Sequence, residues 1–236
     1  MGPSGVVYQA VYMRLATFVG DVTVNGDNNL QIPFPLAGDL PDYFGADQMD
    51  FHYTSEIQGG ELNILRPIGN FQFIAGYRWI QLDESLRLRT FDNDVGTFSD
   101  WSTDSFNQMH YGQIGITGQW QAFGMLNFDF WAKFGVGGDI CGEHQVIRTL
   151  DNSVVFRDIR GQDSGFTYCT ELGVQAVLPL NSTFSLHGGY DVFILNRIAL
   201  APDQMDFNDN ANAGTQVQQR GDLVLHGANF GITAVW

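Results

Sequence analysis

Seven ionisable side chains occupy the polar side of segments in which apolar and polar residues alternate. They are Glu61, Arg78, Asp129, Lys133, Glu171, His187 and Asp191. Every second residue of a β-strand points to the same face, so one face of a sheet would collect all seven. An isolated buried ion costs several kcal/mol, so these groups must pair or stay hydrated. The spacing predicts an ion-pair network that fills an interior; the alternatives are a narrow polar conduit and a catalytic site.

The remaining reactive side chains form no recognised catalytic or metal-binding pattern. The five histidines are scattered, with no pair at the spacing of a helical zinc site. No serine lies in a nucleophile elbow. We therefore expect a protein that is not an enzyme.

Two acidic segments place several oxygen donors close together, as Ca²⁺ prefers. They contain Asp92 and Asp94, and Asp206 and Asp209. Neither segment fits the EF-hand pattern. We expect acidic turns in solvated loops and no cofactor; the alternative is Ca²⁺ that bridges these loops to lipid headgroups or to neighbouring molecules.

Period-two alternation recurs along the whole chain and predicts strands. The last segment alternates Ala228, Phe230, Ile232, Ala234 and Trp236 with small or polar residues. A terminal aromatic such as Trp236 is typical of a residue at a membrane interface. Eight strands are predicted, at about residues 6–18, 51–66, 71–89, 107–121, 125–141, 166–178, 183–200 and 223–236. The faces of the first strand cannot be assigned.

Short and long connections alternate between these strands. Tight turns are expected at residues 67–70, 122–124 and 179–182, and long loops at 19–50, 90–106, 142–165 and 201–222. In an up-and-down barrel, this order places all short turns at one end and all long loops at the other. We predict one all-β domain over residues 1–236, a transmembrane antiparallel barrel of eight strands with short periplasmic turns and long extracellular loops. The alternative is a soluble, ligand-binding barrel.

Composition limits the partners. The net charge of −15 argues against nucleic acid, because phosphate contacts need lysine and arginine. No apolar run approaches ~18 residues, so a membrane protein with this sequence would have to cross as a closed barrel. Residues 1–4 show no charged or apolar region of a signal peptide.

The two cysteines lie at the ends of neighbouring predicted strands. Cys141 ends the fifth strand and Cys169 begins the sixth, and parity places both on the polar, inner face. Opposed residues of an antiparallel pair lie close to disulfide distance. The sequence predicts either a Cys141–Cys169 disulfide or two free, buried cysteines.

Four segments together resemble the planctomycete-type outer-membrane β-barrel (beta-barrel porin) family. They are residues 76–84 (GYRWIQLDE), residues 171–173 (ELG), Gly189-Tyr190 with residues 198–204 (IALAPDQ), and residues 226–231 (HGANFG). The likeness extends from about Glu61 to Trp236. It implies the outer membrane of a Gram-negative-type bacterium, with the lipid bilayer and the barrel-assembly machinery as partners, and no catalytic residue is implied.

The expected role is that of a non-enzymatic membrane protein with a filled polar lumen and acidic surface loops, acting in structure or surface interaction. Transport of small solutes or ions, through a pore formed alone or in an oligomer, is the alternative. A homo-oligomer or a surface lattice is compatible with either role.

Overall fold

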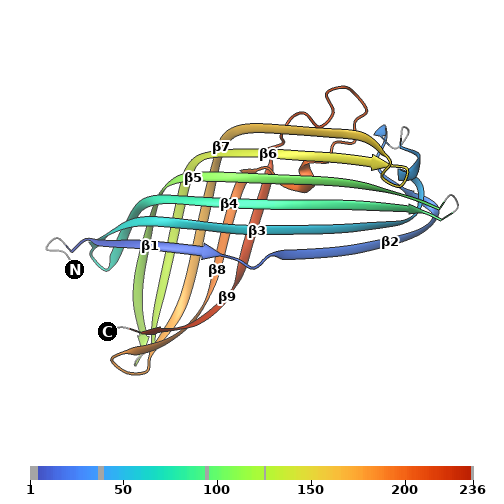
Figure 1. Cartoon of the computed structure of the whole chain (residues 1–236). Helices are drawn as coiled ribbons and strands as arrows, with labels where there is room; N and C mark the ends of the chain where they lie inside the picture. The colour runs from blue at the N-terminus through green and yellow to red at the C-terminus, as the bar shows by residue number, and fades with distance from the viewer. Residues whose placement is uncertain (1–4, 37–39, 94–95, 125, 235–236) are drawn as a thin grey trace.

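The computed structural model of the chain describes residues 5–36, 40–93, 96–124 and 126–234. These residues form one antiparallel sheet of nine strands in the order β1-β3-β4-β5-β6-β7-β8-β9, with β2 also paired to β3 (Figure 1). The strands are β1 (Val7–Arg14), β2 (Phe18–Gln31), β3 (Phe44–Ile68), β4 (Phe71–Asp92), β5 (Thr97–Phe123), β6 (Leu126–Thr149), β7 (Val154–Pro179), β8 (Phe184–Ile198) and β9 (Gly221–Ala234). No helix in these ranges is long and apolar enough to cross a membrane.

The expected count of eight strands is corrected to nine, because the first strand is broken. β1 pairs with residues 58–65 of β3, and β2 pairs with residues 44–55 of the same strand. Residues 15–17 separate β1 from β2, and these two strands lie end to end along one edge of β3. The sheet therefore has eight strand positions across its width.

The three tight turns lie where the sequence predicted them. β3 and β4 are joined at Gly69-Asn70, β5 and β6 at a turn containing Gly124, and β7 and β8 through residues 180–183. Gly69 and Gly124 have φ values of +62° and +57°, which glycine adopts without steric cost. We call this end of the sheet the turn end and the opposite end the far end.

Three of the four expected long loops are wrong, because the strands continue through them. β2 and β3 occupy most of residues 19–50. β4 ends at Asp92 and β5 begins at Thr97, and β6 ends at Thr149 and β7 begins at Val154. The outer-face residues of these stretches are largely polar. A polar outer face fits a strand exposed to water as well as it fits a loop. The β8–β9 connection is long and largely irregular, as expected, with a short 3-10 turn, η3, at Ala201–Gln204.

The strands β2 to β7 extend well beyond β8 and β9 (Figure 1). We call the part of β2–β7 beyond β8 and β9 the distal sheet. β3, with 25 residues, is more than twice as long as the ~9–11 residues that a transmembrane strand needs. One bilayer therefore accommodates only part of each long strand.

Side chains alternate between a buried inner face and an exposed outer face. On β3, the inner face holds Ile57, Asn63 and Leu65, whereas Leu62 and Ile64 are exposed on the outer face. The same alternation holds on β4, where Phe71, Phe73 and Tyr77 are exposed and Ile74 and Arg78 are buried. The sheet is not closed, because no pairing joins β1 to β9 among the described residues.

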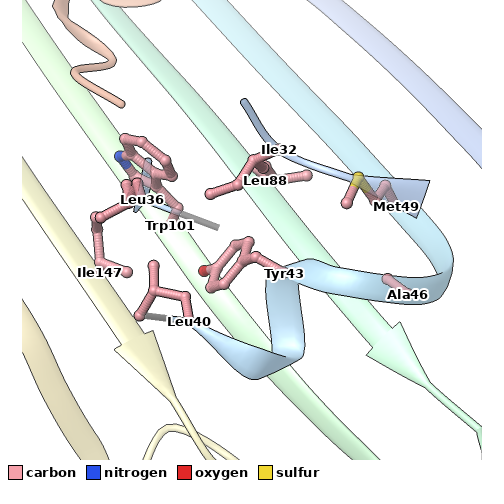
Figure 2. Close-up of a cluster of buried hydrophobic side chains, with 9 residues drawn as sticks. All are labelled: Ile32, Leu36, Leu40, Tyr43, Ala46, Met49, Leu88, Trp101 and Ile147. Carbon is pink, nitrogen blue, oxygen red and sulfur yellow. The ribbon is translucent and has the colours of Figure 1, made fainter. Parts of the chain in front are cut away.

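Two hydrophobic clusters fill the inner face. Near the far end, the β2–β3 connection folds inward so that Leu36, Leu40 and Tyr43 pack against Trp101 and Ile147 of the sheet (Figure 2). The second cluster is made of inner-face residues from five strands: Ile57, Ile80, Leu82, Met109, Tyr111, Cys169, Phe193, Leu195 and Ile198.

Candidate functional site: a paired-charge network on the inner face

Four of the ionisable residues predicted for the inner face come together toward the turn end, where two ion pairs form directly across neighbouring strands. Glu61 of β3 lies opposite Arg78 of β4, and Lys133 of β6 lies opposite Glu171 of β7. The Nη2 atom of Arg78 is 2.7 Å from Oε1 of Glu61, and the Nζ atom of Lys133 is 3.1 Å from Oε1 of Glu171. Direct cross-strand opposition is the geometry in which opposite charges stabilise a sheet.

The two pairs are joined to each other across the interior. Arg78 also donates to Glu171, and Lys133 also donates to Oε2 of Glu61 at 3.1 Å. The result is a ring of two cations and two anions from four strands. Arg78 is only 3% exposed, and its guanidinium lies 5.1 Å from the ring centroid of Phe193.

Neutral side chains complete the network. Glu61 accepts hydrogen bonds from Asn63 at 2.8 Å and from Gln113 at 2.9 Å, and Trp131 Nε1 donates to Glu171 at 2.9 Å. The sequence analysis missed these three residues, because it considered only ionisable groups. Their inner-face parity is the signal that could have found them.

The other three residues of the predicted set lie apart from the ring. Asp129 accepts hydrogen bonds from Gln119 at 3.0 Å and Gln175 at 3.3 Å. Asp191 accepts one from Asn229. His187 lies 3.3 Å from the Thr233 hydroxyl.

A cavity of about 640 Å³ adjoins the ring where the sheet is open. Its polar lining includes Glu61, Arg78, Lys133, Glu171 and Asp191. Its apolar lining comes mainly from β1 and β9, including Val11, Met13 and Leu225. The cavity lies between charged and apolar walls and is open at the gap between the two edge strands, β1 and β9.

The predicted disulfide is wrong: Cys141 and Cys169 are both free, although both are buried on the inner face as parity predicted. In the β6–β7 pairing, Cys141 lies opposite Asp163 and Cys169 opposite Gly135. This register offsets the two cysteines by six residues, or roughly 20 Å along the strands. The sequence predicted a long loop at residues 142–165, where β6 and β7 in fact continue. The register expected between these two strands was therefore wrong.

The acidic segments hold no cluster of metal-ligand side chains within the described part of the chain. The Asp206 carboxylate accepts hydrogen bonds from the backbone N–H groups of Asn208 at 2.9 Å and Gly214 at 2.7 Å, which shape its own loop. Asp94 and Trp236 lie outside the described residues, so the structure says nothing of the roles predicted for them.

The β8–β9 connection lies across the inner face of the distal sheet. Asn107 donates to the carbonyl of Ala199 at 2.8 Å, and Gln145 donates to that of Gln204 at 2.7 Å. Arg157 donates to the carbonyls of Asp206 and Asn208, both at 2.7 Å. Inner-face side chains thus hold the connection over the distal sheet.

A buried acid lies beneath this connection. Glu143 of β6 is 4% exposed, and neither of its carboxylate oxygens has a hydrogen-bond partner among the described residues. Burial, with a smaller contribution from the negative charge of Asp206, raises the pKa of Glu143 to about 7. Folding therefore favours the protonated form of this acid.

The raised pKa of Glu143 predicts that the stability of the folded β8–β9 connection depends on pH. Between about pH 4.5 and 7, the folded state binds more protons than the unfolded state, so stability falls as pH rises through this window and stays low above it. The Gln218 N–H of this connection donates to Oε1 of Gln204 at 2.7 Å. In Glu143→Gln, we expect the protection of this N–H from hydrogen exchange, corrected for the intrinsic rate, to fall less between pH 5 and pH 8 than in the wild type. Part of the fall remains because Asp139, whose pKa burial raises to about 6, still titrates in this range. The wild type should lose protection over the same range, by on the order of 3 kcal/mol. Equal pH profiles for both proteins would contradict the assignment.

The structure is an all-β protein with one antiparallel sheet whose inner face carries two hydrophobic clusters and a ring of paired charges. Residues 15–236 match the model of the family described as "Putative beta barrel porin-7 (BBP7)". The match covers most of the chain, so the protein belongs to this beta-barrel porin family, which confirms the family resemblance seen in the sequence. Searches of curated proteins and of solved structures gave no match.

Proposed function

We propose that this chain is an integral outer-membrane β-barrel protein, without enzymatic activity, whose filled interior serves a structural or surface role. The observation that carries this proposal is the distribution of apolar residues on the outer face. Toward the turn end, every strand position presents large exposed hydrophobic side chains to the outside, and we call this surface the apolar band. It includes Tyr8, Leu62, Ile64, Phe73, Ile114, Ile116, Phe134, Leu172, Val174, Leu186, Phe230 and Ile232.

The height of the apolar band suits a bilayer. On β8, outer-face apolar residues extend from Phe184 to Ile194. About 11 residues at ~3.3 Å each, tilted by roughly 45°, cover about 25 Å, the height of the lipid-facing band in outer-membrane barrels. In water, a patch of this extent would be a liability for a monomer. Contact with lipid accounts for the exposed apolar band.

The outer face of the distal sheet carries charged pairs among scattered exposed apolar residues such as Ile140 and Phe156. It holds solvent-exposed pairs such as Arg89–Asp100, with Nε to Oδ1 at 2.6 Å, and His144–Asp158, at 3.0 Å. We therefore infer that the distal sheet projects into water on one side of the membrane.

A barrel in lipid has no open edge, because unpaired backbone groups in hydrocarbon cost several kcal/mol each. We propose that β1 and β9, which are antiparallel, close the seam in the membrane. Parity then places Tyr8, Ala10 and Tyr12 opposite outer-face residues of β9. Cysteine at Ala10 should form a disulfide with cysteine at Ala228 or at Phe230, and the absence of both in folded protein would contradict closure.

The filled interior favours a structural role over diffusion through a pore. The two hydrophobic clusters, the inward connections and the charge ring all occupy the inner face. Single-channel recording of the folded protein in a planar bilayer tests this directly. We expect no conductance in the wild type. Steady, ion-selective conductance would support transport instead, with the cavity beside the charge ring as part of the path.

A further inference from the structure

The distal sheet has two free edges. Within the described residues, β2 pairs only with β3, and residues 154–167 of β7 pair only with β6, because β8 begins to pair at Tyr168. Each edge presents unpaired backbone N–H and C=O groups to solvent. Edges of this kind are templates for pairing with another strand unless they are shielded.

The β2 edge is least protected over Phe18–Asn25, which pairs with β3 without a bulge and carries one charged residue, Asp21. Its sequence, FVGDVTVNGDNNLQ, contains no proline and no lysine. Val22 and Val24 are 58% and 40% exposed, whereas Met49, which lies opposite Val24 on β3, is buried. The inner-face apolar surface therefore ends at β2 without a neighbour to cover it.

We propose that β2 of one copy pairs with the β7 edge of a second copy, which extends the distal sheet from one molecule to the next. This inference rests on the proposed membrane insertion, which gives all copies the same orientation. β2 and β7 run in opposite directions, so two equally oriented copies bring these edges together as an antiparallel pair. Antiparallel pairing of β2 with another β2 would require inverted copies, which one bilayer does not provide.

Charge and face complementarity support this partner. Asp21 lies on the outer face of β2 and its side chain is 71% exposed, and Arg160 is exposed on the outer face of β7. An antiparallel register that places Asp21 opposite Arg160 also places Val22 opposite Ile159 on the inner face. A heterologous contact of this kind forms a ring when its rotation closes and an open chain of molecules when it does not.

Cysteine cross-linking tests the proposal. Asp21→Cys and Arg160→Cys are prepared separately, and the wild type with its two buried cysteines is the control. When the two variants are inserted together into phospholipid vesicles and mildly oxidised, we expect disulfide-linked dimers. Each variant alone should stay monomeric, and the double variant should form larger cross-linked species. Dimers of Asp21→Cys alone, or no dimers in the inserted mixture, would overturn the proposal.

A second variant separates edge pairing from chance collision. Val22→Lys in the Asp21→Cys protein should abolish cross-linking to Arg160→Cys, because a lysine on an exposed edge opposes strand addition. Thr54→Lys on β3, which lies inside the sheet rather than at its edge, should leave cross-linking unchanged. Equal effects of the two lysines would contradict the edge contact.

Membrane insertion is measured in the same samples by heat-modifiable gel mobility and protection from protease. Inserted protein that fails to cross-link overturns only the edge contact. Protein that does not insert overturns both this contact and the proposed function.

Discussion

Replacing Ile116 by arginine is expected to destabilise the folded protein in a bilayer by about 2–4 kcal/mol. This is the cost of a cationic side chain near the midplane of a lipid-facing barrel surface. Ile116 lies on the outer face of β5, within the apolar band. The change is measured by urea titration of folding in phospholipid vesicles.

Gln108→Arg is the matched control. Gln108 has the same parity on the same strand but lies in the distal sheet, opposite Gln81 of β4 and Ile140 of β6, so the new arginine opposes no like charge. We expect this substitution to change the folding free energy by less than about 0.5 kcal/mol, as is usual for surface sites. Equal losses for the two variants would mean that the outer face of β5 does not pass from lipid to water.

Replacing Arg78 by methionine is expected to destabilise the protein by about 3–5 kcal/mol, because it leaves buried carboxylates without their partner. Glu61 and Glu171 both lose a charge-assisted hydrogen bond, and only Lys133 remains to neutralise them. A second change, Glu171→Gln, removes one of the orphaned charges and should recover part of the loss. The measurement is the same bilayer folding titration.

Arg89→Met provides the comparison for an exposed ion pair. Arg89 pairs with Asp100, but its side chain is 49% exposed. Exposed pairs contribute about 0–1 kcal/mol, so this substitution should have a small effect. A loss as large as that of Arg78→Met would contradict the claim that burial makes the inner ring sensitive.

Parity made much of the fold and part of the site predictable. Alternation in β6 separates Phe128, Phe130 and Phe134 from Asp129 and Lys133, and the structure places these sets on opposite faces. Parity placed Glu61, Arg78, Lys133 and Glu171 on one face, whereas their direct opposition across two strand pairs depends on the strand register.

Register and strand length were not predictable in the same way. Stretches rich in aspartate, serine and threonine, such as residues 97–105, suit both loops and water-exposed strands, and only pairing with neighbours decides between them. The cysteine pairing failed for this reason, since the β6–β7 register depends on a turn near residue 151 and not on the cysteines. The break between β1 and β2 has no signal in residues 12–18 that we recognise.

The central claim is that the turn end of the sheet crosses lipid while the distal sheet stands in water. Spin labels placed one at a time along β7, from Asp158 to Leu178, measure this directly through their accessibility to oxygen and to a water-soluble nickel complex. We expect high oxygen accessibility at alternate positions between Tyr168 and Leu178, and high nickel accessibility at Asp158, Arg160 and Gln162. Nickel accessibility at Leu172 and Val174 equal to that at Arg160 would contradict the account.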